Sequence, residues 1–108
     1  MTGIVALAGT VFGRVRVTAS PEIVLGTTPG LSGQVTATVE EGVGPFSYSW
    51  IRSSGEAGIG PTSPNTAATR FSGVDGTAYF YCRVTDAAGR TGDSNTVEVT
   101  MSPGGPVE

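Results

Sequence analysis

One strand, which ends near the chain's single cysteine, constrains the fold more than any other feature of the sequence. Across residues 77–85 apolar and polar side chains alternate, which is the period-two pattern of a strand with one buried face. The inner face would carry Ala78, Phe80, Cys82 and Val84, and the outer face Tyr79, Tyr81 and Arg83. Trp50, the only tryptophan, lies thirty-two residues before Cys82 in another alternating stretch. Together the two stretches predict a core built around Trp50, Phe80 and Cys82.

Three segments share this alternation with residues 77–85 and predict an all-β domain. Their inward residues are Val35, Ala37 and Val39, then Phe46, Tyr48 and Trp50, then Val97, Val99 and Met101. Seventeen glycines and seven prolines mark many turns, and no stretch has the periodicity of a helix. With 108 residues the chain is long enough for one hydrophobic core and too short for two.

The tryptophan and cysteine strands resemble strands C and F of an immunoglobulin-like sandwich. In antibody domains the tryptophan packs against a disulfide between strands B and F. That disulfide cannot form within this chain, because Cys82 is its only cysteine and Ala37 stands where the partner would fall. Phe80 occupies the tyrosine-corner position, so the corner hydrogen bond is absent or comes from Tyr79 or Tyr81. The resemblance implies an immunoglobulin-like β-sandwich of about seven antiparallel strands, preceded by an extended N-terminal arm.

The sequence divides into an arm at residues 1–12, a sandwich at 13–101 and a flexible tail at 102–108. We expect a first strand over residues 14–18, a further short strand over 22–25 and a turn over 26–30. Residues 55–64 read as a long loop rich in glycine and proline, and residues 86–93 as the connection between the last two strands.

The whole span from about Arg14 to Met101 resembles PKD-like and immunoglobulin-like domains of tailed-bacteriophage structural proteins and bacterial surfaces. The resembling segments are residues 39–50, 80–89 and 94–100, with a Gly-x-x-Pro turn before the aromatic strand. The resemblance implies a non-enzymatic virion accessory protein, in first place a capsid decoration protein, with a tail or neck protein as a close variant. Its partners would be major capsid or tail protein subunits.

The N-terminal arm is apolar on both faces of any strand it forms. Its apolar residues are Ile4, Val5, Leu7, Val11 and Phe12. A strand apolar on both faces needs cover on both, so we predict that the arm binds a partner by strand addition. It could instead fold back as an extra edge strand or remain disordered. The short apolar run follows no basic residue, so it is not read as a signal peptide, and we expect a virion protein assembled in the host cytoplasm.

A second candidate surface is the outer face of the sheet that holds the cysteine strand. Ile51, Tyr79, Tyr81 and Arg83 would lie on it together, and tyrosine and arginine are enriched in interfaces. The alternative is that the tyrosines only shield a half-wet sheet face. Weak adhesion of this outward domain to host surface glycans, and a homo-oligomer on the particle, stay open.

The composition argues against several other function classes. Six scattered basic residues and a net charge of −3 do not favour nucleic acid binding, and no apolar run is long enough for a membrane span. The chain has no histidine, so the sequence predicts no enzyme, no cofactor and no metal. Asp75, Asp86 and Asp93 could offer oxygens to calcium, but each reads better as a turn former. Adjacent Glu40 and Glu41 point to opposite faces of a strand.

Cys82 lies among apolar neighbours, so we interpret it as a small inert core residue rather than a reactive thiol.

The alternative function, from a different class, is a carbohydrate-binding or adhesin module of a bacterial surface protein. Capsid and tail genes beside the gene of this protein would favour the virion protein over the adhesin module.

Overall fold

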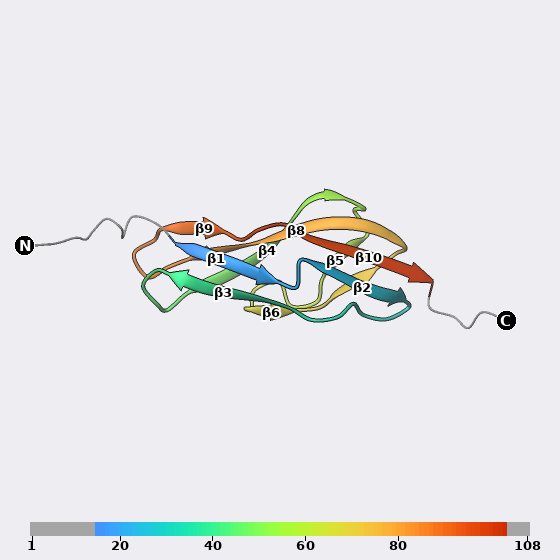
Figure 1. The fold of residues 1–108 in the computed structure, drawn as a ribbon, viewed down its shortest axis with the longest axis horizontal. Coiled ribbons are helices and arrows are strands. Elements are labelled where there is room, and N and C mark those ends of the chain that lie inside the picture. The colour runs from blue at the N-terminus through green and yellow to red at the C-terminus, as the bar shows by residue number, and fades with distance from the viewer. Residues whose placement is uncertain (1–14, 104–108) are drawn as a thin grey trace, which may run out of the picture.

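The computed structural model describes residues 15–103 as two β-sheets packed face to face (Figure 1). Ten strands and no helix are found among these residues. The strands are β1 (Arg16–Ser20), β2 (Ile23–Thr28), β3 (Val35–Glu41), β4 (Ser47–Gly55), β5 (Ile59–Pro61), β6 (Ala68–Thr69), β7 (Phe71–Gly73), β8 (Gly76–Thr85), β9 (Thr91–Asp93) and β10 (Val97–Pro103).

The smaller sheet has the order β1-β3-β6, and the larger has the order β2-β10-β8-β4 with β9 beside β8. β5 and β7 form a separate antiparallel pair. β2 and β10 run parallel, whereas the other strand pairs are antiparallel. The all-β immunoglobulin-like sandwich is confirmed, with ten strands among the described residues and one parallel pair beside the antiparallel ones. The chain passes from β1 in one sheet to β2 in the other without reversing direction, which makes β2 parallel to β10 (Figure 1).

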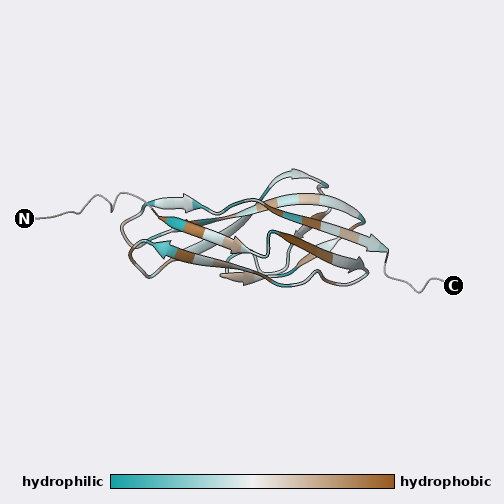
Figure 2. Cartoon of the chain, in the orientation of Figure 1, coloured by the Kyte–Doolittle hydropathy of each residue, from teal (hydrophilic) through white to brown (hydrophobic). Residues whose placement is uncertain are grey.

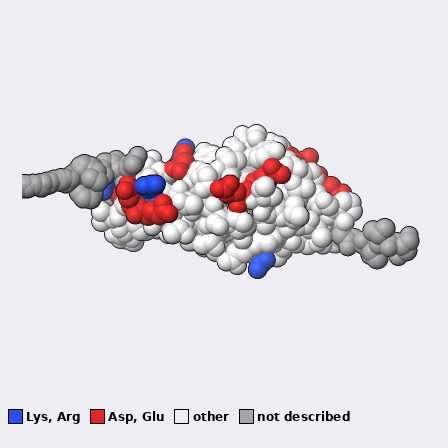
Figure 3. Space-filling view, viewed as in Figure 1, with Lys and Arg blue, Asp and Glu red and all other residues white. Residues whose placement is uncertain are grey.

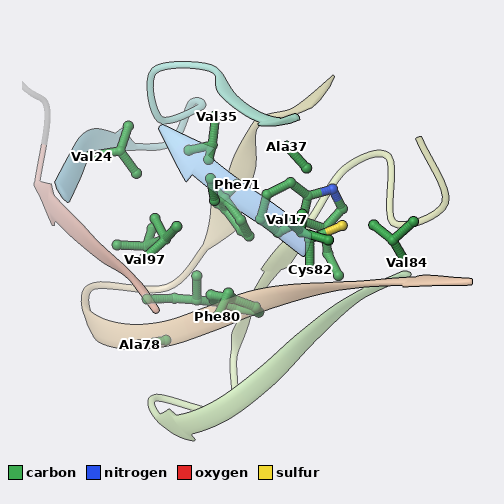
Figure 4. Packing of buried hydrophobic residues seen from close by; sticks show 14 of the residues in the cluster. Val17, Val24, Val35, Ala37, Phe71, Ala78, Phe80, Cys82, Val84 and Val97 are labelled. Atoms are coloured by element: carbon green, nitrogen blue, oxygen red, sulfur yellow. The ribbon is translucent and has the colours of Figure 1, made fainter. Parts of the chain in front are cut away.

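The core lies between the sheets and follows the alternation of the sequence. In Figure 4, Val17 of β1 and Val35 and Ala37 of β3 face the inner side chains of β8. Trp50 stands opposite Cys82 in the β4–β8 ladder, and Trp50, Phe80 and Cys82 are all buried. Val97, Val99 and Met101 of β10 are buried beside them, while Val39, Phe46 and Tyr48 pack half-buried at the margin.

The centre of the core is Phe71 of β7, which the sequence analysis did not single out. Its ring meets that of Trp50 edge-on with centroids 6.0 Å apart, and that of Phe80 at 4.5 Å. Such aromatic pairs are worth about 0.5–1.5 kcal/mol beyond the area that they bury. Phe71 therefore contacts the ring of Trp50 on β4 and the ring of Phe80 on β8 and joins the two in one aromatic cluster.

Several boundaries differ from the expected ones. β1 spans 16–20 rather than 14–18, and β2 continues through Thr28 into the expected turn. The expected loops hold structure: β5 lies within 55–64, and β9 within 86–93. β10 extends to Pro103, past the expected start of the tail, because Ser102 and Pro103 pair with Thr27 and Thr28.

The two expected loops lie at opposite ends of the elongated sandwich. β4 and β8 are antiparallel, with Ser47 opposite Thr85 and Gly55 opposite Ala78. The 86–90 turn therefore lies at the end where β1 begins, which we call the proximal end, and the loop after Gly55 lies at the distal end (Figure 1). These loops cannot form one shared binding site.

Candidate interaction surface

The structure brings Ile51, Tyr79, Tyr81 and Arg83 together on the outer face of the larger sheet. Ile51 of β4 stands directly opposite Tyr81 of β8, and Arg83 opposite Ser49. Tyr79 stands opposite Glu98 of β10. Ile51 and both tyrosines are half-buried, while Arg83 is exposed. The four residues lie together on the outer face of β8 and β4.

Arg83 is held in place by two neighbours on this face. Its Nε donates to Asp93 Oδ1 at 2.8 Å and its Nη2 to Asp93 Oδ2 at 3.2 Å. The guanidinium also lies 5.6 Å from the centre of the Tyr81 ring, within reach of a cation–π contact. Asp93 neutralises the charge of Arg83, so this part of the face offers an aromatic ring and a neutral ion pair rather than net charge.

The outer face extends further than the sequence indicated, across β10 to β2. Ile23 stands opposite Glu98 and Leu25 opposite Thr100, and these two side chains are 61% and 68% exposed. Figure 2 shows the hydrophobic stretch of β2 along the sheet edge. In the sequence, only the apolar run Ile23-Val24-Leu25 could have indicated this extension of the face. Of the three residues, Val24 faces the core and the other two face outward. An exposed apolar rim of this kind can mark an interaction site.

The predicted arm residues Ile4, Val5, Leu7, Val11 and Phe12 lie outside the described residues. The described chain begins at Val15, which lines a cleft of about 390 Å³ together with Arg16, Val17 and Asp93. Asp93 is the same residue that holds Arg83. The start of the described chain at Val15 therefore adjoins the tyrosine face, and paired charges lie close together at this end in Figure 3.

Asp86 builds the turn at the proximal end and was expected only to form a turn. Its buried carboxylate accepts hydrogen bonds from the amides of Ala88 and Arg90 at 3.0 and 2.9 Å, and from Val43 N–H at 3.3 Å. The Arg90 guanidinium adds contacts at 3.2 and 3.0 Å. Through Val43 the carboxylate joins the 86–90 turn to the loop between β3 and β4, which fixes both loops at the proximal end.

This carboxylate makes the stability of the domain depend on pH. Burial opposes its ionisation, but the amides of Arg90 and Val43 and the Arg90 guanidinium outweigh burial and lower the pKa of Asp86 below its ordinary value. The stabilisation is therefore fully present above the unfolded-state pKa, near 4, and is lost as the pH falls through the lower folded-state pKa.

We expect Asp86→Asn to be less stable than the wild type at pH 7 and to lose less stability on acidification. Thermal unfolding from pH 7 to pH 2 measures both effects. Asp75→Asn is the matched control, because Asp75 is an exposed carboxylate whose partner is the Thr28 hydroxyl. It should retain the acid dependence of the wild type. Equal acid dependence in Asp86→Asn and the wild type would contradict the role given to Asp86.

The described residues offer no assembled metal site or membrane helix. Within residues 15–103 no three acidic, cysteine or histidine side chains come together. Asp75 and Asp86 lie at opposite ends of β8, and Asp93 is engaged with Arg83. The same part of the chain contains no helix long and apolar enough to cross a membrane.

Cys82 is fully buried, and burial raises the pKa of its thiol to about 11. Because the thiolate is the reactive form, we expect a thiol reagent at pH 8 to label the native protein slowly and the urea-unfolded protein rapidly. The melting temperature should not change on addition of a reductant. Rapid labelling of the native thiol would show that the core opens readily at β8.

Comparison with known proteins shows the fold. Two solved structures are similar over nearly their whole length: the PKD domain of human KIAA0319 and the PKD domain of the KIAA 1837 protein. The first has a TM-score of 0.66 and 19% identity, covering 98% of this chain and 99% of that one. The second has a TM-score of 0.63 and 21% identity, covering 95% and 99%. The chain thus has the immunoglobulin-like sandwich of PKD domains. No protein-family model matches it, and no curated protein sequence is similar.

Proposed function

We propose that this protein is a non-enzymatic attachment module that its N-terminal arm anchors to a larger assembly. The observation that carries the proposal is that residues 15–103 already enclose a core between two sheets. The apolar residues of the arm are then surplus to that core, and a partner would supply the cover that they need. Val15 and Pro103, the described ends, lie at opposite ends of the sandwich (Figure 1). An anchor at the proximal end would therefore present the distal end outward.

For the assembly, we propose the exterior of a tailed-phage particle, with the chain as a decoration protein of the head. The support is the resemblance of residues 39–50, 80–89 and 94–100 to domains of phage structural proteins. The close variant places it on the tail or neck. In either position its partners would be capsid or tail subunits, and the particle would be assembled in the host cytoplasm.

A second candidate function is a carbohydrate-binding or adhesin module of a bacterial surface protein, which would use the outer face of the larger sheet. Tyr79, Tyr81 and Ile51 together with the exposed Ile23 and Leu25 give this face aromatic, aliphatic and hydroxyl groups. Tyrosine side chains of this kind suit weak contacts with a glycan or a protein. On a virion the same face would serve host adhesion, so both candidates use it.

Fractionation of a culture that produces the particles separates the two candidates. The proposal predicts that the protein, detected by antibody or mass spectrometry, follows the purified particles through a density gradient. Capsid and tail genes should flank its gene. Recovery in the cell-envelope fraction of uninfected cells, without particle association, would favour the adhesin.

A further inference from the structure

Asn95 lies between β9 and β10 and contacts the backbone of β1 in the other sheet. The Ala19 N–H donates to Asn95 Oδ1 at 2.8 Å, and Asn95 Nδ2 donates to the Ala19 carbonyl at 3.1 Å. A neighbouring antiparallel strand would make the same two hydrogen bonds with Ala19. The side-chain amide of Asn95 therefore satisfies the Ala19 backbone groups that a further strand beside β1 would otherwise pair with.

β1 is an edge strand, with β3 on one side only. In its ladder with β3, the backbone groups of alternate residues point in the same direction, so those of Val17 point away from β3 as those of Ala19 do. Val17 also lines a cleft together with Val15, Arg16 and Asp93. At Val15 the edge is closed again, because a Cβ placed on Gly92 of β9 would lie 2.0 Å from the Val15 carbonyl oxygen.

The edges of β2 and β4 are covered in a different way. Along β2 the Leu25 carbonyl accepts from Gly33 N–H at 3.1 Å, and along β4 the Trp50 N–H donates to the Pro64 carbonyl at 2.9 Å. Backbone segments make these contacts, so no single side chain decides whether the edge is covered. At Ala19, by contrast, the side chain of Asn95 alone covers the edge, so a single substitution would uncover it.

We propose that Asn95 keeps the β1 edge from pairing with β1 of a second copy of this chain. An uncovered strand edge is a template for pairing with another chain. A two-fold axis would bring two β1 edges together antiparallel along residues 17–20, where the backbone groups of Val17 and Ala19 point away from β3. The only charged side chain of β1 is Arg16, which pairs with Glu40 and lies outside this segment. This inference does not rest on the proposed function.

The test compares three variants of the full chain by sedimentation velocity over a wide range of protein concentration. Asn95→Ala removes the cover, and we expect it to associate to a dimer as the concentration rises. Asn95→Asp places a charge at the edge, which opposes pairing, and should remain monomeric although it also loses the Nδ2 donor. Asn65→Ala is the matched control, because Asn65 also donates to one backbone carbonyl, that of Tyr48 at 3.3 Å. It should sediment as the wild type does.

A folded Asn95→Ala that stays monomeric at every concentration would overturn the proposal. So would equal association of Asn65→Ala or Asn95→Asp, since the β1 edge would then not be the cause. Should Asn95→Ala fail to fold, amide hydrogen exchange in the wild type tests the premise of the proposal, which is the cover of Ala19 by Asn95. The covered Ala19 amide should exchange at least about tenfold more slowly than that of Val17, which Asn95 does not cover. Equal exchange of the two amides would refute the cover by Asn95.

Discussion

Replacement of Trp50 by alanine should lower the free energy of unfolding by about 3–5 kcal/mol, enough to unfold a domain near the lower limit of ordinary stability, about 5 kcal/mol. Trp50 is only 5% exposed. Its ring meets Phe71 edge-on, and its Nε1 donates to the Thr66 carbonyl at 2.9 Å. Alanine would leave a cavity between the sheets and take the donor from that carbonyl. The segment that contains Thr66 also covers the edge of β4, so its order should suffer with the core.

Tyr81→Ala is the control for this prediction, because it also removes an aromatic ring, from the outer face. Tyr81 is half-buried and its contacts are the Arg83 guanidinium and the neighbouring strand. We expect a loss of roughly 1 kcal/mol, the size of a cross-strand pair. Urea titration of both variants gives the two values. A similar loss for Tyr81→Ala and Trp50→Ala would show that the core is not where the structure places it.

The inner faces of the strands could be predicted from the sequence because alternation records burial residue by residue. Ala78, Phe80, Cys82 and Val84 are all buried, and the outer residues Tyr79 and Tyr81 are not. The pattern is local, and one wrong step would have exchanged the two faces. Ile51 lies beside Tyr81 because β4 and β8 are neighbours in the sheet.

What could not be predicted depends on contacts between distant residues. Asn95 and Ala19 are 76 positions apart, and nothing in the residues near Asn95 indicates which backbone it will meet. The run Ile23-Val24-Leu25 suggests a strand buried on both sides, but β2 is an edge strand with one face outward. Phe71 lies in a three-residue strand, which is too short for periodicity to show. The sequence indicates only a turn at Asp93, whereas in the structure Asp93 of β9 lines the cleft and contacts Arg83.

Removal of residues 2–12 should abolish attachment of the protein to its particle or partner and leave the sandwich folded. The large apolar residues Ile4, Val5, Leu7, Val11 and Phe12 could each contribute roughly 1.5–3 kcal/mol when a partner buries them. Part of that sum offsets the cost of ordering the arm. The remainder should still dominate the affinity, because the outer face of the sandwich offers only a weak contact beside it.

A pair of matched substitutions separates the apolar character of the arm from its mere presence. Ile4→Asp with Leu7→Asp should abolish attachment, because each would place a carboxylate in the buried contact. Thr2→Asp with Thr10→Asp adds the same charge at polar positions of the arm and should weaken attachment far less. Equal effects of the two pairs would point to charge repulsion rather than to burial of the apolar residues.

Attachment by the arm is tested most directly by co-sedimentation of the protein lacking residues 2–12 with particles that lack the endogenous protein, alongside its thermal unfolding. We expect a cooperative transition close to that of the full chain and a protein that stays in the supernatant while the full chain sediments. Sedimentation equal to that of the full chain would contradict attachment by the arm and move the binding site to the face of Ile51, Tyr79 and Tyr81. Loss of the cooperative transition would show instead that the arm is a strand of the sandwich itself.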